Sequence, residues 1–107
     1  MNVLLDTHVA LWAITDSPQL SLKARDVVLA SRNHIWVSAA SLWEIAIKHS
    51  LGRGNMPVSG EEALGYFRQA GYGTSDRILI AQALTEPMRL LTHDETVASY
   101  SDTIILV

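Results

Sequence analysis

The chain has 107 residues, of which 49% are apolar and 18% charged, a composition that supports one packed domain over residues 1–107 and excludes a disordered chain. It has no cysteine, which excludes disulfides and thiolate zinc sites. The apolar runs are too short to cross a membrane and the first residues lack a signal-peptide pattern, so we expect a cytoplasmic protein. With a formal net charge of −3, binding of nucleic acid would require cations at an acidic site.

Short apolar runs alternate with segments of helical spacing. In chain order they predict a strand at Val3–Leu5, helices over Thr7–Ile14 and Leu22–Ala30, a strand at Ile35–Val37, and helices over Ala39–Leu51 and from Ser59 onward. Then follow a turn at Gly71–Ser75, a helix over Asp76–Thr85, a strand at Met88–Leu91, a short helix over Asp94–Tyr100 and a strand at Ile104–Val107. This alternation predicts an α/β fold with a short parallel sheet that helices cover on both faces. We expect the first, second and third of these strands to be neighbours in its core.

Several polar residues follow the predicted strands directly. The active site of a parallel sheet lies beyond the carboxyl ends of its strands, which here are followed by Asp6, Ser38 and Thr92-His93-Asp94. Glu44 and Asp76 lie on helices that such a sheet would bring over the same edge. Each acid could also cap a helix, Glu44 through a capping box with Ser41, and for any one of them alone capping is the favoured interpretation.

Taken together, the four acids favour a metal site. Glu44 lies between the apolar residues Trp43 and Ile45, near the buried side of its helix, where an unpaired carboxylate is costly. Converging carboxylates repel one another unless a divalent cation is present. Oxygen ligands suit Mg²⁺ or Mn²⁺, which can activate water for attack on a phosphate.

Four segments resemble the signature segments of PIN domains, and most closely those of the VapC branch. They are Leu4-Leu5-Asp6-Thr7-His8, Val37 to Ile45 (VSAASLWEI), Asp76 to Ala83 (DRILIAQA) and Leu91-Thr92-His93-Asp94. The resemblance implies a PIN-like three-layer sandwich. It also implies a metal-dependent endoribonuclease, the toxin of a type II toxin–antitoxin system, which hydrolyses RNA phosphodiester bonds and has a cognate antitoxin as its partner.

The resemblance assigns roles to individual residues. The catalytic, metal-binding cluster comprises Asp6, Glu44, Asp76 and Asp94. We expect Asp6 and Asp76 to be the main ligands of Mg²⁺ or Mn²⁺, and Glu44 and Asp94 to act through water or a second ion. Supporting hydroxyl groups are implied at Thr7, Ser38 and Thr92. Arg77 could hold a substrate phosphate or pair with a carboxylate of the cluster.

The sequence departs from the family pattern at one place. Family members carry a further strand and helix before the Asp-Arg segment, whereas Gly71–Ser75 passes directly into Asp76. The shortening favours an alternative function, a catalytically impaired module that binds an antitoxin or self-associates, while retention of all four acids favours the nuclease. A phosphorylated receiver domain is less favoured, since no lysine follows Lys48.

The remaining aromatic and histidine residues receive structural interpretations. His8 and His93 could contact substrate or act in proton transfer, but hydrogen-bonded structural roles at strand ends are favoured. The tryptophans are interpreted as core or partner-groove residues rather than a base-stacking platform, because they do not interleave with basic residues. The apolar helices around Trp12 and Trp43 predict a homodimer. The short Gly71–Ser75 link also invites exchange of the C-terminal segment between subunits.

Overall fold

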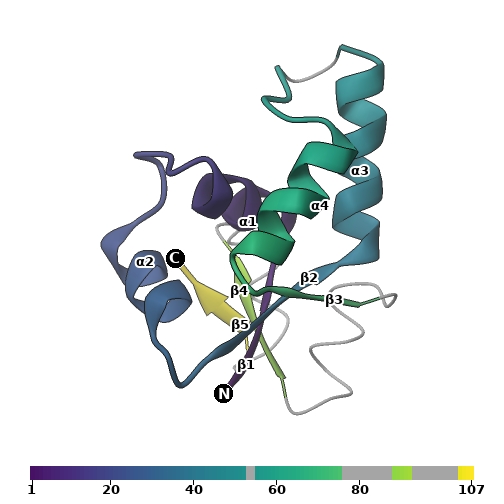
Figure 1. Cartoon of the computed structure of the whole chain (residues 1–107). Coiled ribbons are helices and arrows are strands. Elements are labelled where there is room, and N and C mark those ends of the chain that lie inside the picture. The colour runs from purple at the N-terminus through teal and green to yellow at the C-terminus, as the bar shows by residue number, and fades with distance from the viewer. Residues whose placement is uncertain (53–54, 76–87, 93–103) are drawn as a thin grey trace.

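A computed structural model describes residues 1–52, 55–75, 88–92 and 104–107 and contains a five-stranded sheet in the order β3-β2-β1-β4-β5 (Figure 1). The strands are β1 Asn2–Leu5, β2 His34–Ser38, β3 Gly73–Ser75, β4 Met88–Thr92 and β5 Ile104–Leu106. Every neighbouring pair is parallel. The predicted parallel sheet is therefore confirmed, with β1 at its centre between β2 and β4.

The described helices are α1 Thr7–Ile14, α2 Leu22–Leu29, α3 Ala39–Ser50 and α4 Gly60–Gln69. Each begins directly after a polar side chain that accepts a hydrogen bond from a backbone N–H of the first turn. These N-caps are Asp6, Ser21, Ser38 and Ser59. Such caps satisfy amides that have no partner within the helix, which is why local sequence located the helix starts correctly.

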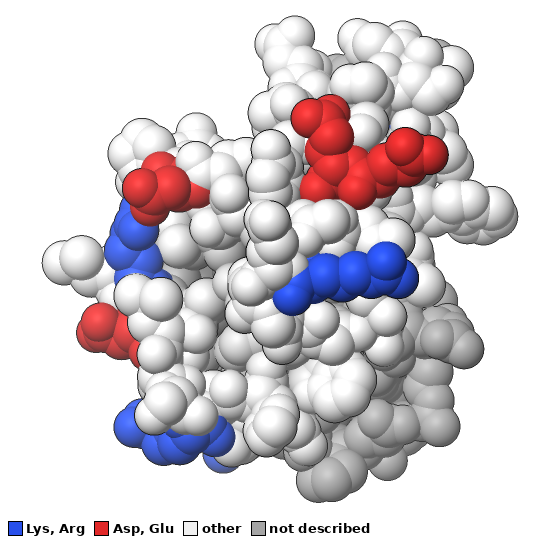
Figure 2. All heavy atoms as spheres, viewed as in Figure 1, with Lys and Arg blue, Asp and Glu red and all other residues white. Residues whose placement is uncertain are grey.

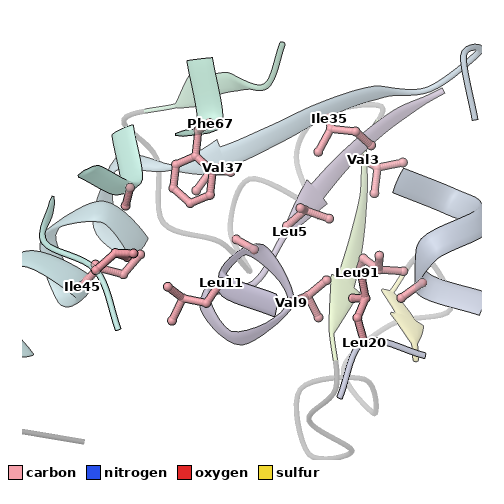
Figure 3. Packing of buried hydrophobic residues seen from close by; sticks show 14 residues of the cluster. Val3, Leu5, Val9, Leu11, Leu20, Ile35, Val37, Ile45, Phe67 and Leu91 are labelled. Atoms are coloured by element: carbon pink, nitrogen blue, oxygen red, sulfur yellow. The ribbon is translucent and has the colours of Figure 1, made fainter. Parts of the chain in front are cut away.

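The hydrophobic core lies between the helices and one face of the sheet. Val3 and Leu5 of β1 point to this face and are fully buried. The helices contribute side chains to the same cluster, and Figure 3 shows Val9, Ile45 and Phe67 among them. Leu4 and Leu90, which pair across β1 and β4, alternate to the opposite face and are also fully buried. Burial on both faces accounts for the continuous apolar runs of these strands.

The prediction of a turn at Gly71–Ser75 is wrong in its second half, because Gly73–Ser75 forms strand β3 beside Trp36–Ser38. The indole of Trp36 packs against Gly73 so closely that a Cβ there would lie 2.5 Å from Trp36 Cε3. The absence of a side chain at Gly73 therefore allows the Trp36 indole to pack directly against β3. Sequence reasoning assigned the glycine-rich segment to a turn because that contact depends on a residue far away in the chain.

The structure is an α/β fold whose all-parallel sheet and four described helices are compatible with a three-layer sandwich. The helices predicted over Asp76–Thr85 and Asp94–Tyr100 lie outside the described residues. Within the described ranges, no helix is both long and apolar enough to span a membrane.

Candidate functional site

The strand order predicts a ligand-binding crevice at the carboxyl edge of the sheet. From β1 the chain proceeds outward to β2 and β3, then returns to the other side of β1 for β4 and β5. Ligands of open α/β sheets bind where the order reverses in this way, between the carboxyl ends of the two central strands. Asp6 directly follows β1 and Thr92 is the last residue of β4. These two residues therefore flank the crevice.

The Asp6 side chain is held at both oxygens. Its Oδ1 accepts a hydrogen bond of 2.9 Å from the backbone N–H of Val9 in the first turn of α1. Its Oδ2 accepts the hydroxyl hydrogen bond of Thr92, and its backbone N–H donates to the Leu91 carbonyl over 3.0 Å. The carboxylate is half-buried, and these hydrogen bonds fix its orientation between the carboxyl ends of β1 and β4.

A second polar contact joins α1 to α3. The Thr7 hydroxyl donates a hydrogen bond of 2.9 Å to the Ser41 Oγ, and Ser41 is almost completely buried. Thr7, expected to support the acidic cluster, is therefore tied to α3 immediately beside Asp6. Sequence reasoning did not assign a role to Ser41 in the site. The signal available was its spacing, one turn after Ser38 and one turn before Glu44, on the same side of α3.

Glu44 lies on α3 one turn beyond Ser41. It follows the exposed Trp43 and precedes the buried Ile45, and its own side chain is 37% exposed. Its Oε1 lies 3.3 Å from Nζ of Lys48 in an i,i+4 ion pair. The expectation of an uncompensated carboxylate near the buried side is thus wrong for the described part of the chain, because α3 turns this position partly outward and supplies a cation. The alternative Ser41–Glu44 capping box is also wrong, since the N-cap is Ser38.

Ser38 stands in the same row as Asp6 at the sheet edge. Since Leu5 pairs with Val37, the next residues of β1 and β2 are Asp6 and Ser38. Ser38 is fully buried, and its Oγ accepts a hydrogen bond of 3.1 Å from the Ala40 N–H. It also pairs with Ser75 at the end of β3, the residue that precedes Asp76 in the chain. The predicted site residues Asp76, Arg77 and Asp94 lie outside the described residues.

The donor set at this edge suits a hard cation. Asp6, Ser38 and Thr92 offer oxygen atoms alone, and the sequence has no thiol to compete for a softer metal. No group of three or more His, Asp or Glu residues that could hold a metal occurs among the described residues, which contain two of the four predicted acids. The N-termini of α1 and α3 begin at the same edge, and helix N-termini favour bound phosphate.

The charged side chains form no extended phosphate-binding surface on the face drawn in Figure 2, where blue and red side chains of the described residues are interspersed. Comparisons of the chain with family models, with characterised proteins and with solved structures gave no match. The interpretation of this site therefore depends on its geometry alone.

Proposed function

We propose that the chain is a Mg²⁺- or Mn²⁺-dependent endoribonuclease of the VapC type, a PIN-domain toxin that cleaves RNA. The observation that carries this proposal is the Asp6 carboxylate, held by the Val9 N–H and the Thr92 hydroxyl in the crevice between β1 and β4. A carboxylate oriented by two hydrogen bonds at this point of a parallel sheet is suited to hold a cation against a substrate phosphate.

The proposal gives each side chain a separate task. Asp6, together with Asp76, holds the cation, while Glu44 and Asp94 act through water or a second ion. Thr92 keeps the Asp6 carboxylate in its orientation. When bound, a Mg²⁺ or Mn²⁺ ion supplies an activated water and stabilises the charge that builds up on the phosphate. Arg77 and the N-termini of α1 and α3 favour binding of the phosphate itself.

The proposed reaction is hydrolysis with the 3′ oxygen as leaving group. The water oxygen bonds to phosphorus, the P–O3′ bond breaks, and the departing 3′ oxygen gains a proton. The products are a 5′-phosphate and a 3′-hydroxyl, and the 2′-hydroxyl takes no part in the attack. An RNA with a single 2′-deoxy sugar at the cleavage position should therefore still be cut. If the 2′-hydroxyl were the attacking group, this RNA would not be cleaved.

A second candidate function is a catalytically impaired module that binds an antitoxin or a second copy of the chain. The observation in its favour is an exposed apolar stripe on α3, formed by Trp43, Ile47 and Leu51. We include a homodimer in the main proposal for the same reason, with exchange of the C-terminal segment as one way of forming it. A cognate antitoxin partner is proposed from the family resemblance. The test is whether co-expression of that antitoxin relieves the toxicity of this chain to the cell.

The test of the nuclease is RNA cleavage by the wild type and by Asp6→Asn, with Mg²⁺ or Mn²⁺ and with EDTA. Asn is as good an N-cap as Asp, so Val9 keeps an acceptor and the fold should survive. A neutral amide is a poor ligand for a hard cation, so we expect cleavage and Mn²⁺ binding to be lost. The matched control is Asp16→Asn, which alters an 84% exposed side chain paired with Arg25.

The outcomes separate the two candidates. Wild-type cleavage that is equally fast in EDTA would disprove the metal mechanism. Mn²⁺ binding by the wild type without cleavage of any RNA would favour the impaired module. Equal loss of cleavage in Asp16→Asn would show that the effect of Asp6→Asn is not specific to the site.

A further inference from the structure

A pocket of about 500 Å³ lies between α1 and the segment that follows α3. One wall is a single face of α1 that carries His8, Leu11 and Trp12. The opposite wall holds Lys48 of α3 and the Asn55–Pro57 loop. The lining is more polar than apolar, so the pocket suits a ligand that combines a flat apolar face with several polar groups.

The α1 wall offers aromatic surface. His8 and Trp12 are one helical turn apart, with ring centroids separated by 6.0 Å and planes inclined at 45°. The His8 side chain is exposed and that of Trp12 is half-buried against the core. An exposed ring beside a fixed indole provides a surface on which a planar base can stack.

The rim of the pocket carries hydrogen-bonding side chains. Gln19 and Asn55 are exposed amides, each with donors and an acceptor that can pair with base edges. Lys48 is a cation in this wall, and no carboxylate belongs to the described lining. The pocket therefore suits an uncharged aromatic group that is attached to an anion, which is the chemistry of a nucleotide.

Two residues of the pocket lining connect it to the predicted site residues. His8 is two residues beyond Asp6, and Lys48 is ion-paired with Glu44. A polynucleotide phosphate at Asp6 would lie toward the His8 end of the pocket, because both residues lie at the start of α1.

We propose that this pocket binds one nucleobase of the RNA, adjacent to the phosphate that is cleaved. The proposal rests on the nuclease function for the identity of the polymer, but binding in the pocket needs neither metal nor catalysis. It favours substrate contact by His8 over a structural role, and it revises the interpretation of Trp12 as a core or partner-groove residue. Nucleobase binding here would select which positions of an RNA are cut.

The test is a titration of the ¹⁵N-labelled chain, in EDTA, with each of the four nucleoside 5′-monophosphates. We expect one or more of them to shift the Trp12 indole N–H signal in the millimolar range and to leave that of the exposed Trp43 unchanged. Ribose 5-phosphate, which lacks the base, should bind at least about fivefold more weakly, since stacking of one base is worth a few-fold to a hundredfold in affinity. Equal binding of ribose 5-phosphate would overturn base recognition.

His8→Ala should weaken mononucleotide binding by about fivefold or more, while the matched control His34→Ala, an exposed histidine at the start of β2, should not. For RNA cleavage, His8→Ala should raise KM with little change in kcat and leave Mn²⁺ binding unaltered. If an apolar peptide shifts the Trp12 indole signal and none of the nucleotides does, the pocket binds a protein partner and the proposal is refuted. If Asp6→Asn loses cleavage but still binds mononucleotides, the result supports the metal site and the nucleobase pocket separately.

Discussion

At the scale of single residues, Asp6 caps a helix with one carboxylate oxygen and joins a distant strand with the other. One oxygen accepts the Val9 N–H of α1, and the other accepts the hydroxyl of Thr92 from a strand on the far side of the crevice. The cap fixes the side-chain rotamer that a ligand would require. The capping role, which the sequence presents as an alternative to a metal-binding role, therefore does not exclude the proposed metal-binding role.

The role of Thr92 as a positioning residue can be tested by Thr92→Val. The two side chains have similar shape, so the change removes the hydrogen bond to Asp6 and little volume at a fully buried position. Loss of an outer partner of a metal ligand typically lowers metal affinity or activity about 10–100-fold. We expect a loss of this order in Mn²⁺ binding by calorimetry and recovery in Thr92→Ser. Failure of the serine variant to recover would show that Thr92 acts through packing alone.

At the scale of elements, α4 begins with a reciprocal capping box. Glu62 donates its N–H to the Ser59 hydroxyl, and its carboxylate accepts the Ser59 N–H. The backbone and side-chain hydrogen bonds of Ser59 lower the pKa of Glu62 below its usual 4.5. A lowered folded-state pKa stabilises the fold above the unfolded-state pKa, and this contribution is lost as the pH falls through the lower, folded-state value.

Glu62→Gln tests this pH dependence. Glutamine keeps an acceptor for the Ser59 N–H but does not titrate. The free energy of unfolding should therefore fall less between neutral pH and pH values below 4.5 in the variant than in the wild type. Urea denaturation at both pH values measures the difference. Glu61→Gln, at the neighbouring exposed acid of the same first turn, is the control and should keep the wild-type dependence.

The β2–β3 contact makes a second prediction at this scale. In Gly73→Ala the new methyl group would meet the Trp36 indole at 2.5 Å, and the overpacking should cost about 1–3 kcal/mol of unfolding free energy. Gly65→Ala in α4 meets no atom within 4 Å and should instead stabilise by about 0.5–1 kcal/mol, since alanine favours helix. Chemical denaturation gives both values. Equal effects of the two substitutions would contradict the close contact.

At the scale of the whole molecule, α3 extends away from the sheet and is only partly covered (Figure 1). Trp43, Ile47 and Leu51 follow one another at intervals of four residues and are 74%, 49% and 59% exposed. These three apolar residues line a shallow groove together with Glu44 and Lys48. An antiparallel pair of such helices about a two-fold axis would join the apolar stripes and bring each glutamate toward the partner's lysine, which makes the face self-complementary.

The proposed dimer predicts that Ile47→Glu produces monomers. Loss of a central anchor typically costs about 2 kcal/mol, roughly 30-fold in Kd. Light scattering at micromolar concentration should show a dimer for the wild type and for Leu22→Glu, which alters an 80% exposed leucine on α2. A wild-type monomer would contradict the dimer. A dimer that persists in Ile47→Glu would favour exchange of the C-terminal segment instead of pairing through α3.

The local elements could be predicted from the sequence because their signals are local. The starts of α1 and α4 follow from Asp6 and Ser59, whose side chains bond to amides three residues away. The buried strands β1 and β4 follow from apolar runs that need no knowledge of their partners. The expectation that polar residues gather at one edge also follows, since parallel strands of similar length end together.

Only the tertiary structure determined which residues far apart in the sequence contact one another. The Thr92–Asp6 hydrogen bond links residues 86 positions apart, and the Thr7–Ser41 bond links residues 34 apart. Gly73–Ser75 is a strand because it pairs with Trp36–Ser38 of β2, a partner that no pattern within Gly71–Ser75 indicates. Hydrophobic periodicity reports which side of an element is buried, but not which element covers it. The choice of partners depends on strand order and register, which are settled only when the whole sheet assembles.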